Sequence, residues 1–392
     1  MHQEFDLLTK NIEEIIPHNT LKVKLESGQA LRVKLGADPT KPDLHLGHIV
    51  VLNKLKEFQQ NGHNVIFLIG DFTAKIGDPS GRSKMRPVLS DREIKANVKT
   101  WLKQVGRVLD VKKCEIRHNS EWFSQMSFED LLKIASQVSL SNVIERDDFK
   151  KRIKEGRHLA VSEILYPIMQ GYDSVMLKAD VEIGGQDQKL NMLMGRDLQG
   201  AYGQTRQDVI TLPLLSGTDG KKMSKSSGNY IGLNDSASNA FGKLMSVSDQ
   251  LIKEYLLLVS NFSKREVEDL QAKLKSGANP KNIKEQMAHR IVSIYWGEEE
   301  ADKARSEFDR IFSKKETPER VGRVKFASRE ISLLDAMTRT GLAKSKSDAK
   351  RLIKQSAVRI DGKVVDDEFS TINLETDRVM QVGKRRFIKL GR

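Results

Sequence analysis

The chain has 392 residues, of which 38% are hydrophobic and 30% are charged. This balance is typical of a globular protein, and the length predicts two or three domains. No apolar run approaches the roughly 20 residues that a membrane-spanning helix needs, and the first ten residues lack the apolar core of a signal peptide. We therefore expect a cytoplasmic protein that has no membrane partner.

The single cysteine, Cys114, excludes an internal disulfide and suits a reducing compartment. No Cys/His cluster accompanies it, so no metal ligands are predicted. The formal net charge of +13 favours a polyanionic partner, because Lys and Arg neutralise phosphates. A solvated, lysine-rich surface is the alternative. Residues 331–392 hold 14 Lys/Arg against 8 Asp/Glu, nearly half of the net charge, which favours a dedicated nucleic-acid module.

A strand–helix–strand unit is expected near the N-terminus. Residues 31–35 alternate as in a strand, and a turn follows them. Residues 44–60 have helical character, and Asn61 with Gly62 is expected to end that helix. Residues 64–69 form the continuous apolar run of a buried parallel strand. This order predicts a parallel sheet with a right-handed crossover.

Four further segments complete the first 330 residues. From residue 91 to about 199 the pattern is largely helical, and residues 208–215 indicate a last strand. A loop rich in Gly, Ser and Lys follows that strand. Residues 235–312 have the pattern of amphipathic helices, with almost no strand signal. The charged, polar segment 313–329 indicates a linker.

The last 62 residues are expected to form a unit of their own. Ser345 is predicted to cap a helix with three lysines on one face. These are Lys346, Lys350 and Lys354. Residues 358–365 indicate a hairpin with an Asp-Gly turn. A terminal strand-like run at 379–390 carries three more basic residues, which are Lys384, Arg385 and Arg386.

A motif with two histidines lies between the first strand and its helix. Residues 39–48 are Pro-Thr-Lys-Pro-Asp-Leu-His-Leu-Gly-His. Unpaired backbone N–H groups and the helix dipole favour anions at such a helix start. His45 and His48 can hydrogen-bond phosphate oxygens there, and Gly47 leaves room for a nucleotide against the backbone. Ordinary histidines that cap the helix are the alternative.

A second motif follows the last predicted strand. Residues 221–228 are Lys-Lys-Met-Ser-Lys-Ser-Ser-Gly. Three lysines in a flexible loop can close over a triphosphate, and their charge matters most as pyrophosphate leaves. A basic surface loop is the alternative, and the motif taken alone favours it.

Together, the two motifs resemble the signatures of class I aminoacyl-tRNA synthetases. Residues 45–48 resemble the family's His-Ile-Gly-His with one conservative change, and residues 222–226 match its Lys-Met-Ser-Lys-Ser. Over essentially the whole chain, the resemblance is closest to bacterial tyrosyl-tRNA synthetases. It implies ATP-dependent activation of L-tyrosine to tyrosyl-adenylate and transfer to tRNA(Tyr). It also implies Mg²⁺ with ATP and a homodimer.

The resemblance implies an α/β fold with three parts. A Rossmann-like, parallel-sheet catalytic domain with a helical insertion is expected at 1–230. An α-helical anticodon-side domain is expected at 231–318 and a linker at 319–330. A small S-four-like α/β domain at 331–392 would bind RNA. Its expected RNA contacts are Lys346, Lys350, Lys354, Lys384, Arg385 and Arg386.

Residue roles are implied by the same resemblance. The residues expected in catalysis are Thr40, His45, His48, Arg82, Arg86, Lys222 and Lys225. The residues expected to bind ATP are Asp38, Gly47, Gly185, Asp187 and Lys225. The residues expected to bind tyrosine are Thr73, Asp78, Tyr166, Gln170, Asp173 and Gln188.

The preference for tyrosine rests mainly on one helix. Tyr166, Gln170 and Asp173 fall at positions i, i+4 and i+7, so a helix presents them on one face. The resemblance places Tyr166 and Gln170 at the substrate's amino group and Asp173 at its phenol. A pocket that hydrogen-bonds a hydroxyl strongly rejects the analogue that lacks it.

Three residues depart from the pattern of many bacterial members. Lys34 stands where those members carry a tyrosine that contacts the phenol. Leu35 replaces a cysteine on the ribose side, and Val51 replaces a threonine. A second bacterial subfamily shares the forms of the motifs found here. Lys34 therefore leaves the partner of Asp173 at the phenol unidentified.

Two rival functions are considered. A tryptophanyl-type enzyme shares the class I core but usually lacks the C-terminal module. An RNA-binding protein could keep the synthetase fold without activity. The intact His45, His48, Lys222, Lys225 and Asp173 argue against that second rival.

Overall fold

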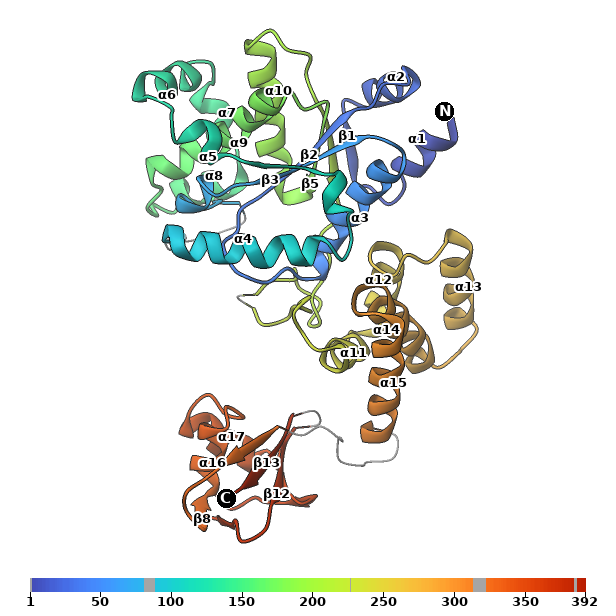
Figure 1. Cartoon of the computed structure of the whole chain (residues 1–392), viewed down its shortest axis with the longest axis vertical. Coiled ribbons are helices and arrows are strands. Elements are labelled where there is room, and N and C mark those ends of the chain that lie inside the picture. The colour runs from blue at the N-terminus through green and yellow to red at the C-terminus, as the bar shows by residue number, and fades with distance from the viewer. Residues whose placement is uncertain (1, 81–88, 226, 313–321, 384–385) are drawn as a thin grey trace. The chain divides into compact units, whose positions relative to one another are not determined.

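The structure is a computed structural model that describes residues 2–80, 89–225, 227–312, 322–383 and 386–392. It divides into two compact units, drawn in Figure 1. Unit 1 comprises Met1–Ser236 and Lys243–Gly297, and unit 2 comprises Ala237–Gly242 and Glu298–Arg392. The domain boundaries expected from the sequence, at residues 230, 318 and 330, rest on family resemblance and not on compactness. They stay a prediction.

A six-stranded sheet forms the centre of unit 1. Its strand order is β1 (Glu14–Ile16), β6 (Asp208–Leu212), β5 (Val181–Gly185), β2 (Arg32–Ala37), β3 (Asn64–Ile69) and β4 (Glu115–His118). β1 runs antiparallel to β6, and all the other neighbours are parallel. The predicted strand–helix–strand unit is confirmed as β2, α3 (Leu46–Gln60) and β3. Gly62, with φ of +84°, ends that helix as expected.

Two strands lie in the segment that was predicted to be largely helical. β4 contains only one aliphatic residue, Ile116, so it lacks an apolar run. β5 carries Glu182, which is buried because it pairs with Lys34 on the adjacent strand β2. A buried charge hides a strand from patterns of hydrophobicity. The predicted last strand ends at Leu212, because Pro213 has no N–H for a sheet hydrogen bond.

Helices cover both faces of this sheet. Figure 1 shows α9 (Val161–Leu177) and α10 (Lys189–Ala201) on one side, with α3 and α4 (Asp91–Val105) on the other. Gly171 lets α9 and α10 approach closely, since a Cβ there would lie 2.9 Å from Met194 Cγ. The remaining helices of the first 200 residues are short. They are α1 (His2–Leu8), α2 (Thr20–Glu26), α5 (Ser120–Phe123), α6 (Phe128–Ala135), α7 (Leu140–Ile144) and α8 (Asp147–Lys154).

The helices predicted over residues 235–312 are confirmed. They are α11 (Ala237–Met245), α12 (Ile252–Leu258), α13 (Lys264–Lys275), α14 (Pro280–Trp296) and α15 (Glu298–Phe312). Ser263 and Glu266 form a reciprocal capping box at the start of α13. Pro280 occupies the first turn of α14, where its missing N–H costs no helical hydrogen bond.

The C-terminal residues form two small sheets and two helices. The larger sheet has the order β10 (Lys363–Val364), β9 (Val358–Ile360), β12 (Arg378–Val382), β13 (Arg386–Gly391) and β7 (Arg323–Lys325). β11 (Thr371–Asn373) pairs with β8 (Glu330–Ser332). These sheets pack with α16 (Leu333–Arg339) and α17 (Lys346–Lys354) around a core of buried residues between Phe326 and Leu390.

Most local predictions for this part are confirmed, and two are wrong. Ser345 caps α17, and Asp361 with Gly362 forms the turn of the predicted hairpin at positive φ. The linker was expected to include residues 323–325, but these form β7, which pairs with β13. The terminal run is two strands rather than one. No helix in the described part of the chain is long and apolar enough to cross a membrane.

Candidate functional site

A cavity of about 770 Å³ lies at the carboxyl ends of the parallel strands of unit 1. The chain adds β3 and β4 on one side of β2, and β5 and β6 on the other, so the winding reverses between β2 and β5. Ligands of α/β sheets bind at such a switch point. Every described residue predicted for catalysis, ATP or tyrosine lines this cavity. They are Asp38, Thr40, His45, Gly47, His48, Thr73, Asp78, Tyr166, Gln170, Asp173, Gly185, Asp187, Gln188, Lys222 and Lys225.

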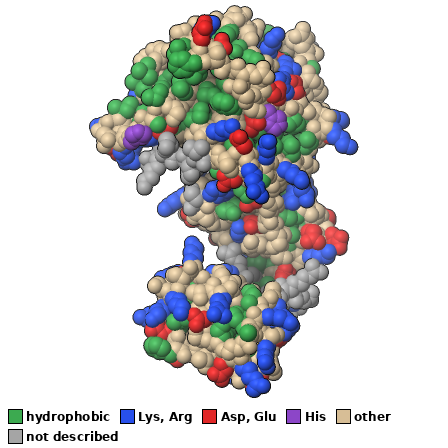
Figure 2. Space-filling view, turned by 60° about the vertical axis from the view of Figure 1, so that its left-hand side comes forward, with side chains coloured by type: hydrophobic (Ala, Val, Ile, Leu, Met, Phe, Trp, Pro, Cys, Tyr) green, Lys and Arg blue, Asp and Glu red, His purple; other side chains and the backbone are tan. Residues whose placement is uncertain are grey.

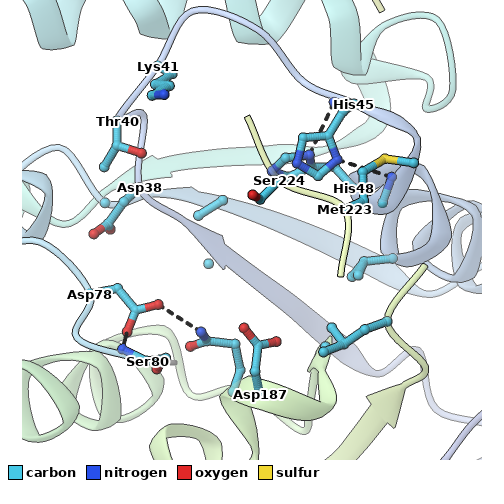
Figure 3. A pocket seen from close by; sticks show the side chains of 18 of the residues that line it. Asp38, Thr40, Lys41, His45, His48, Asp78, Ser80, Asp187, Met223 and Ser224 are labelled. Atoms are coloured by element: carbon cyan, nitrogen blue, oxygen red, sulfur yellow. Dashed lines mark hydrogen bonds between the residues drawn. The ribbon is translucent and has the colours of Figure 1, made fainter. Parts of the chain in front are cut away.

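Opposite kinds of polar group face each other across the cavity. Figure 3 shows Thr40, His45 and Ser224 on one side, where the two signature loops meet. Asp78 and Asp187 lie on the other side. The cavity therefore offers N–H and hydroxyl donors to an anion where the two signatures meet, and the carboxylates of Asp38, Asp78 and Asp187 to a cation or a hydroxyl group.

The two histidines of the first signature cap helix α3. His45 Nδ1 accepts from the N–H of Gly47 at 3.2 Å, and His48 Nδ1 accepts from the N–H of His45 at 3.2 Å. The two histidines thus cap the helix, as the alternative interpretation expected. Capping uses only the Nδ1 atoms and leaves the Nε2 atoms available to a ligand. Because each Nδ1 accepts, the proton of each neutral ring resides on Nε2, which stays able to donate.

Both histidines are held neutral by their surroundings. Burial lowers the pKa of His48 to about 4, and the ammonium of Lys225 adds to the shift. Burial also lowers the pKa of His45 far below its usual range, and His48, Lys225 and Lys222 add to it. At neutral pH the rings therefore act as neutral N–H donors and not as cations.

The second signature packs against the first. Met223 is buried, and its N–H donates to the carbonyl of Leu215 at 3.1 Å. The Lys225 ammonium donates to the carbonyl of Asp43 in the first signature loop. Burial lowers the pKa of Lys225 to about 8, although Asp43 opposes the shift. The Lys222 ammonium lies 2.8 Å from a carboxylate oxygen of Asp187.

A chain of hydrogen bonds orients the residues at the end of β2. Tyr166 Oη donates to Asp38 at 2.9 Å, and Thr73 Oγ1 donates to the other oxygen of Asp38 at 2.8 Å. Asn119 Nδ2 in turn donates to Thr73 Oγ1 at 2.9 Å. Gly70 is required there, because a Cβ at that position would lie 2.1 Å from Asp38 Oδ1.

A buried amide organises residues that are expected at the amino group and at the carboxyl end of the substrate. Asn191 Nδ2 donates to Gln170 Oε1 at 2.9 Å and to Gln188 Oε1 at 3.0 Å. Gln188 Nε2 then donates to Asp78 Oδ2 at 2.8 Å. The Arg146 guanidinium donates to Asn191 Oδ1, which fixes the orientation of this amide. Asn191 therefore fixes the amide orientations of Gln170 and Gln188, because both oxygens accept from it.

Asp173 is fully buried between two donors that sequence reasoning missed. Trp122 Nε1 donates to Asp173 Oδ1 at 3.0 Å, and Asn119 Nδ2 donates to Oδ2 at 3.4 Å. Burial raises the pKa of Asp173 to about 8, although the ammonium of Lys34 and these two donors oppose the shift. Both donors follow β4, the strand that the sequence pattern concealed, so no local signal pointed to them.

Lys34 lies under α9 and does not line the cavity. Its ammonium forms a buried ion pair with Glu182 at 3.0 Å and donates to Ser174 Oγ at 2.8 Å. It also donates to the carbonyl of Gln170 at 3.3 Å. Lys34 therefore acts on Asp173 through its charge, from beneath the helix that carries Asp173.

The remaining predicted residues lie elsewhere or are not described. Arg82, Arg86, Lys384 and Arg385 lie outside the described residues. In the C-terminal part, Lys346 pairs with Asp335 at 2.9 Å and Lys350 with Glu368 at 3.3 Å, whereas Lys354 is exposed. Arg386 donates to the carbonyl of Leu342 at 2.7 Å.

Comparison with known proteins gives two family matches. Residues 26–313 match the model described as tRNA synthetases class I (W and Y), and residues 333–375 match the S4 domain. A tyrosine–tRNA ligase of Thermotoga maritima is 45% identical over 391 residues, which cover 99% of this chain and 97% of that protein. The chain belongs to the tyrosine–tRNA ligase family. A member from Nitratidesulfovibrio vulgaris is 46% identical over 391 residues, 99% of this chain and 98% of that protein.

Solved structures share the fold. The tyrosyl-tRNA synthetase of Archaeoglobus fulgidus, solved with L-tyrosine, has a TM-score of 0.63 and 23% identity, and the match covers 78% of this chain and 99% of that one. A C-terminally truncated mitochondrial tyrosyl-tRNA synthetase of Aspergillus nidulans has a TM-score of 0.66 and 20% identity, covering 79% and 93%. The Rossmann-like catalytic fold predicted from the sequence is thereby confirmed.

Proposed function

We propose that this chain attaches tyrosine to tRNA(Tyr) in two steps at the cavity of unit 1. Tyrosine's carboxylate attacks the α-phosphorus of ATP, which gives tyrosyl-adenylate and pyrophosphate. The terminal ribose of the tRNA then attacks the acyl carbon. The observation that carries this proposal is the convergence of both signatures and the tyrosine-specific residues of α9 on one cavity at the switch point of the sheet.

No side chain needs to act as a nucleophile in the first step. Catalysis comes from positioning the reactants and stabilising charge as pyrophosphate leaves. The Nε2–H groups of His45 and His48 donate to phosphate oxygens, and they do so without the desolvation cost of a buried cation. The ammonium groups of Lys222 and Lys225 transfer from Asp187 and the Asp43 carbonyl to the phosphates. Thr40 adds a hydroxyl donor.

Mg²⁺ would enter with the triphosphate. Its preferred ligands are oxygens of phosphates, water and a few carboxylates, so the nucleotide itself supplies most of its coordination. Arg82 and Arg86, outside the described residues, are proposed to add positive charge near pyrophosphate. Asp38, Gly47, Gly185 and Asp187 are proposed to hold the nucleoside part of ATP.

Tyrosine is proposed to lie along α9. Its ammonium meets Asp78 and Tyr166 with Thr73 and Gln170 nearby, and Gln188 contacts its carboxyl end. Its phenol reaches Asp173 at the closed end of the pocket. An oxygen of the Asp173 carboxyl group, oriented by Trp122 and Asn119, accepts the phenolic hydrogen. Phenylalanine would leave this buried acceptor without that donor, which costs binding energy.

The C-terminal part is proposed to bind the tRNA. Figure 2 shows Lys and Arg side chains spread over its visible face. Modules of this kind contact RNA mainly through shape and backbone, so dispersed positive charge suits the task. The proposed RNA contacts are Lys346, Lys350, Lys354, Lys384, Arg385 and Arg386. RNA phosphates would replace Asp335 and Glu368 as partners of two of these lysines.

A cytoplasmic homodimer is proposed as the working form. Large exposed hydrophobic side chains occur between residues 128 and 161, a segment that includes α6, α7 and α8. They are Phe128, Leu132, Leu140, Ile153 and Val161. A contiguous patch of such side chains would mark a protein–protein contact. Sedimentation equilibrium would give twice the chain mass, and a concentration-independent monomer would rule the dimer out.

Exchange of labelled pyrophosphate into ATP tests the first step directly. We expect exchange with tyrosine and none above background with tryptophan. Tryptophan-dependent exchange would instead support the tryptophanyl-type rival. Charging of tRNA(Tyr) by the purified protein tests the second step, and RNA binding without exchange or charging would identify an inactive RNA-binding protein.

A further inference from the structure

The loop that leads into the first signature has one short backbone bond, from the N–H of Thr40 to the carbonyl of Asp38 at 2.7 Å. Residues 38–44 belong to no helix or strand. Pro39 and Pro42 have no N–H groups, so the loop cannot form a regular ladder of backbone bonds. Carbonyls in such a loop need partners from elsewhere, because buried backbone polar groups are almost always paired.

Helix α4 supplies these partners from one face. Asn97 Nδ2 donates to the carbonyl of Pro39 at 2.8 Å, and Trp101 Nε1 donates to the carbonyl of Lys41 at 2.7 Å. Gln104 Nε2 donates to the carbonyl of Pro42 at 2.9 Å. The three side chains are buried, and their spacing of i, i+4 and i+7 places them on one face of the helix.

Gln104 holds the loop with both ends of its amide. Besides the bond to Pro42, its Oε1 accepts from the N–H of Leu44 at 2.8 Å. Leu44 immediately precedes His45, which starts the signature. The ring of Trp101 also meets His48 edge-on, with ring centroids 6.2 Å apart. The same helix face therefore contacts both the loop and the first turn of α3.

The segment after the second signature is tied to the same place. Arg107, just beyond the end of α4, donates to the carbonyl of Leu233. The N–H of Leu233 donates to the carbonyl of Leu44 at 2.9 Å, and that of Leu46 donates to the carbonyl of Ile231 at 3.0 Å. The backbones that flank both signatures are thus joined to each other and to α4.

We infer that α4 is a strut that sets the distance between the two signatures, with Asn97, Trp101 and Gln104 as positioning residues for adenylate formation. Trp101 also lines the cavity, whereas Asn97 and Gln104 do not and act only through the loop. Their effect is transmitted through the backbone of residues 39–44, which carries Thr40 and leads into His45. The inference rests on the proposed function, because it assigns these residues to the first step of that reaction.

The variant Gln104→Met tests the strut. It removes the two hydrogen bonds of the side-chain amide to Pro42 and Leu44, and it nearly preserves the length of the side chain. We expect kcat for tyrosine-dependent pyrophosphate exchange to fall by about 100-fold, the loss typical of a misplacement near 1 Å. The dissociation constant for tyrosine without ATP should stay unchanged, because α9, Asn119 and Trp122 hold that pocket. Trp101→Phe should lower kcat in the same direction, because it removes the bond to the carbonyl of Lys41 and shrinks the ring that meets His48.

Lys103→Met is the matched control, because Lys103 is the exposed neighbour of Gln104 on the same helix. It should exchange pyrophosphate like the wild type. Unchanged kcat in folded Gln104→Met and Trp101→Phe would overturn the inference. An equal loss of tyrosine affinity would also overturn it, since that result indicates a general structural role. Failure of the wild type to exchange with tyrosine would instead count against the proposed function. If Gln104→Met does not fold, Trp101→Phe decides alone.

Discussion

Burial decides the chemistry of individual residues at this site. The ring nitrogens of His45 and His48 are neutral donors because burial and nearby lysines disfavour a positive charge there. The same burial disfavours the negative charge of Asp173 and raises its pKa to about 8. Each residue type was suggested by its motif, whereas its protonation state follows from its neighbours.

Replacement of Asp173 tests its proposed place at the phenol. Asp173→Ala should lower discrimination between tyrosine and phenylalanine, because neither substrate then leaves a buried acceptor unpaired. Tyrosyl-tRNA synthetases are themselves the standard example of such rejection, at about 10⁵-fold, so a loss of several orders of magnitude is expected. The ratio of kcat/KM values in pyrophosphate exchange measures it. Asp197→Ala, at an exposed carboxylate of α10, is the control. An unchanged ratio would remove the role of Asp173.

The lowered pKa of Lys225 predicts a pH dependence. With a pKa of about 8, its ammonium is charged below pH 8 and loses its proton as the pH rises through 8. At saturating tyrosine, kcat/KM for ATP should therefore fall above pH 8, by up to about tenfold per unit. In Lys225→Arg this decline should disappear, since guanidinium keeps its proton. Lys103→Arg should keep the wild-type profile. A decline at pH 8 in both variants would assign it to another group.

At the level of helices and strands, one buried ion pair connects β2, β5 and α9. Lys34 on β2 and Glu182 on β5 are direct neighbours in the sheet, and Lys34 also bonds to Ser174 on α9. Gln207 donates to Glu182 from the start of β6. The pair thus lies where the strand order reverses, directly beneath α9, which carries the residues proposed to select tyrosine.

Removal of one partner of this pair should be costly. Lys34→Met leaves the buried Glu182 without its cation, and we expect a loss of about 3–5 kcal/mol in the free energy of unfolding. The double variant Lys34→Met with Glu182→Gln should recover much of that loss. Urea unfolding followed by tryptophan fluorescence suits the measurement, because Trp101, Trp122 and Trp296 all belong to unit 1. Additive effects of the two substitutions would show that the pair is not coupled.

At the scale of the whole molecule, the cavity and the basic C-terminal part belong to different units. The cavity is built entirely from unit 1, whereas the core between Phe326 and Leu390 belongs to unit 2. Nearly half of the net charge lies in residues 331–392. The proposed adenylate chemistry and the proposed binding of RNA therefore depend on different parts of the sequence.

Truncation after residue 313 should uncouple these tasks. Tyrosine-dependent pyrophosphate exchange should persist, because no residue of the cavity is removed. Charging of tRNA should be lost, since the basic C-terminal part no longer neutralises phosphates. The KM for tRNA of the full chain should also rise steeply with salt. Equal loss of exchange and charging would mean that the C-terminal part is structural.

Local patterns were sufficient wherever one segment carries the whole signal. The β2–α3–β3 unit, the helices of residues 235–312, the Ser345 cap and the Asp361–Gly362 turn follow from periodicity and turn chemistry within short windows. The two signatures and the spacing of Tyr166, Gln170 and Asp173 are likewise local. By itself, the sequence therefore determined the class of fold, the family and half of the residues that line the cavity, 15 of 30.

The tertiary structure alone decided what surrounds those residues. β4 and β5 were missed because their few apolar positions and the charge of Glu182 make sense only beside Lys34 and the neighbouring strands. The hydrogen bonds of Trp122 and Asn119 to Asp173 join residues that lie far apart in the chain. The same is true of the hydrogen bonds from α4 to the loop before the first signature. Burial and such contacts set protonation and orientation, and neither is encoded in any single segment.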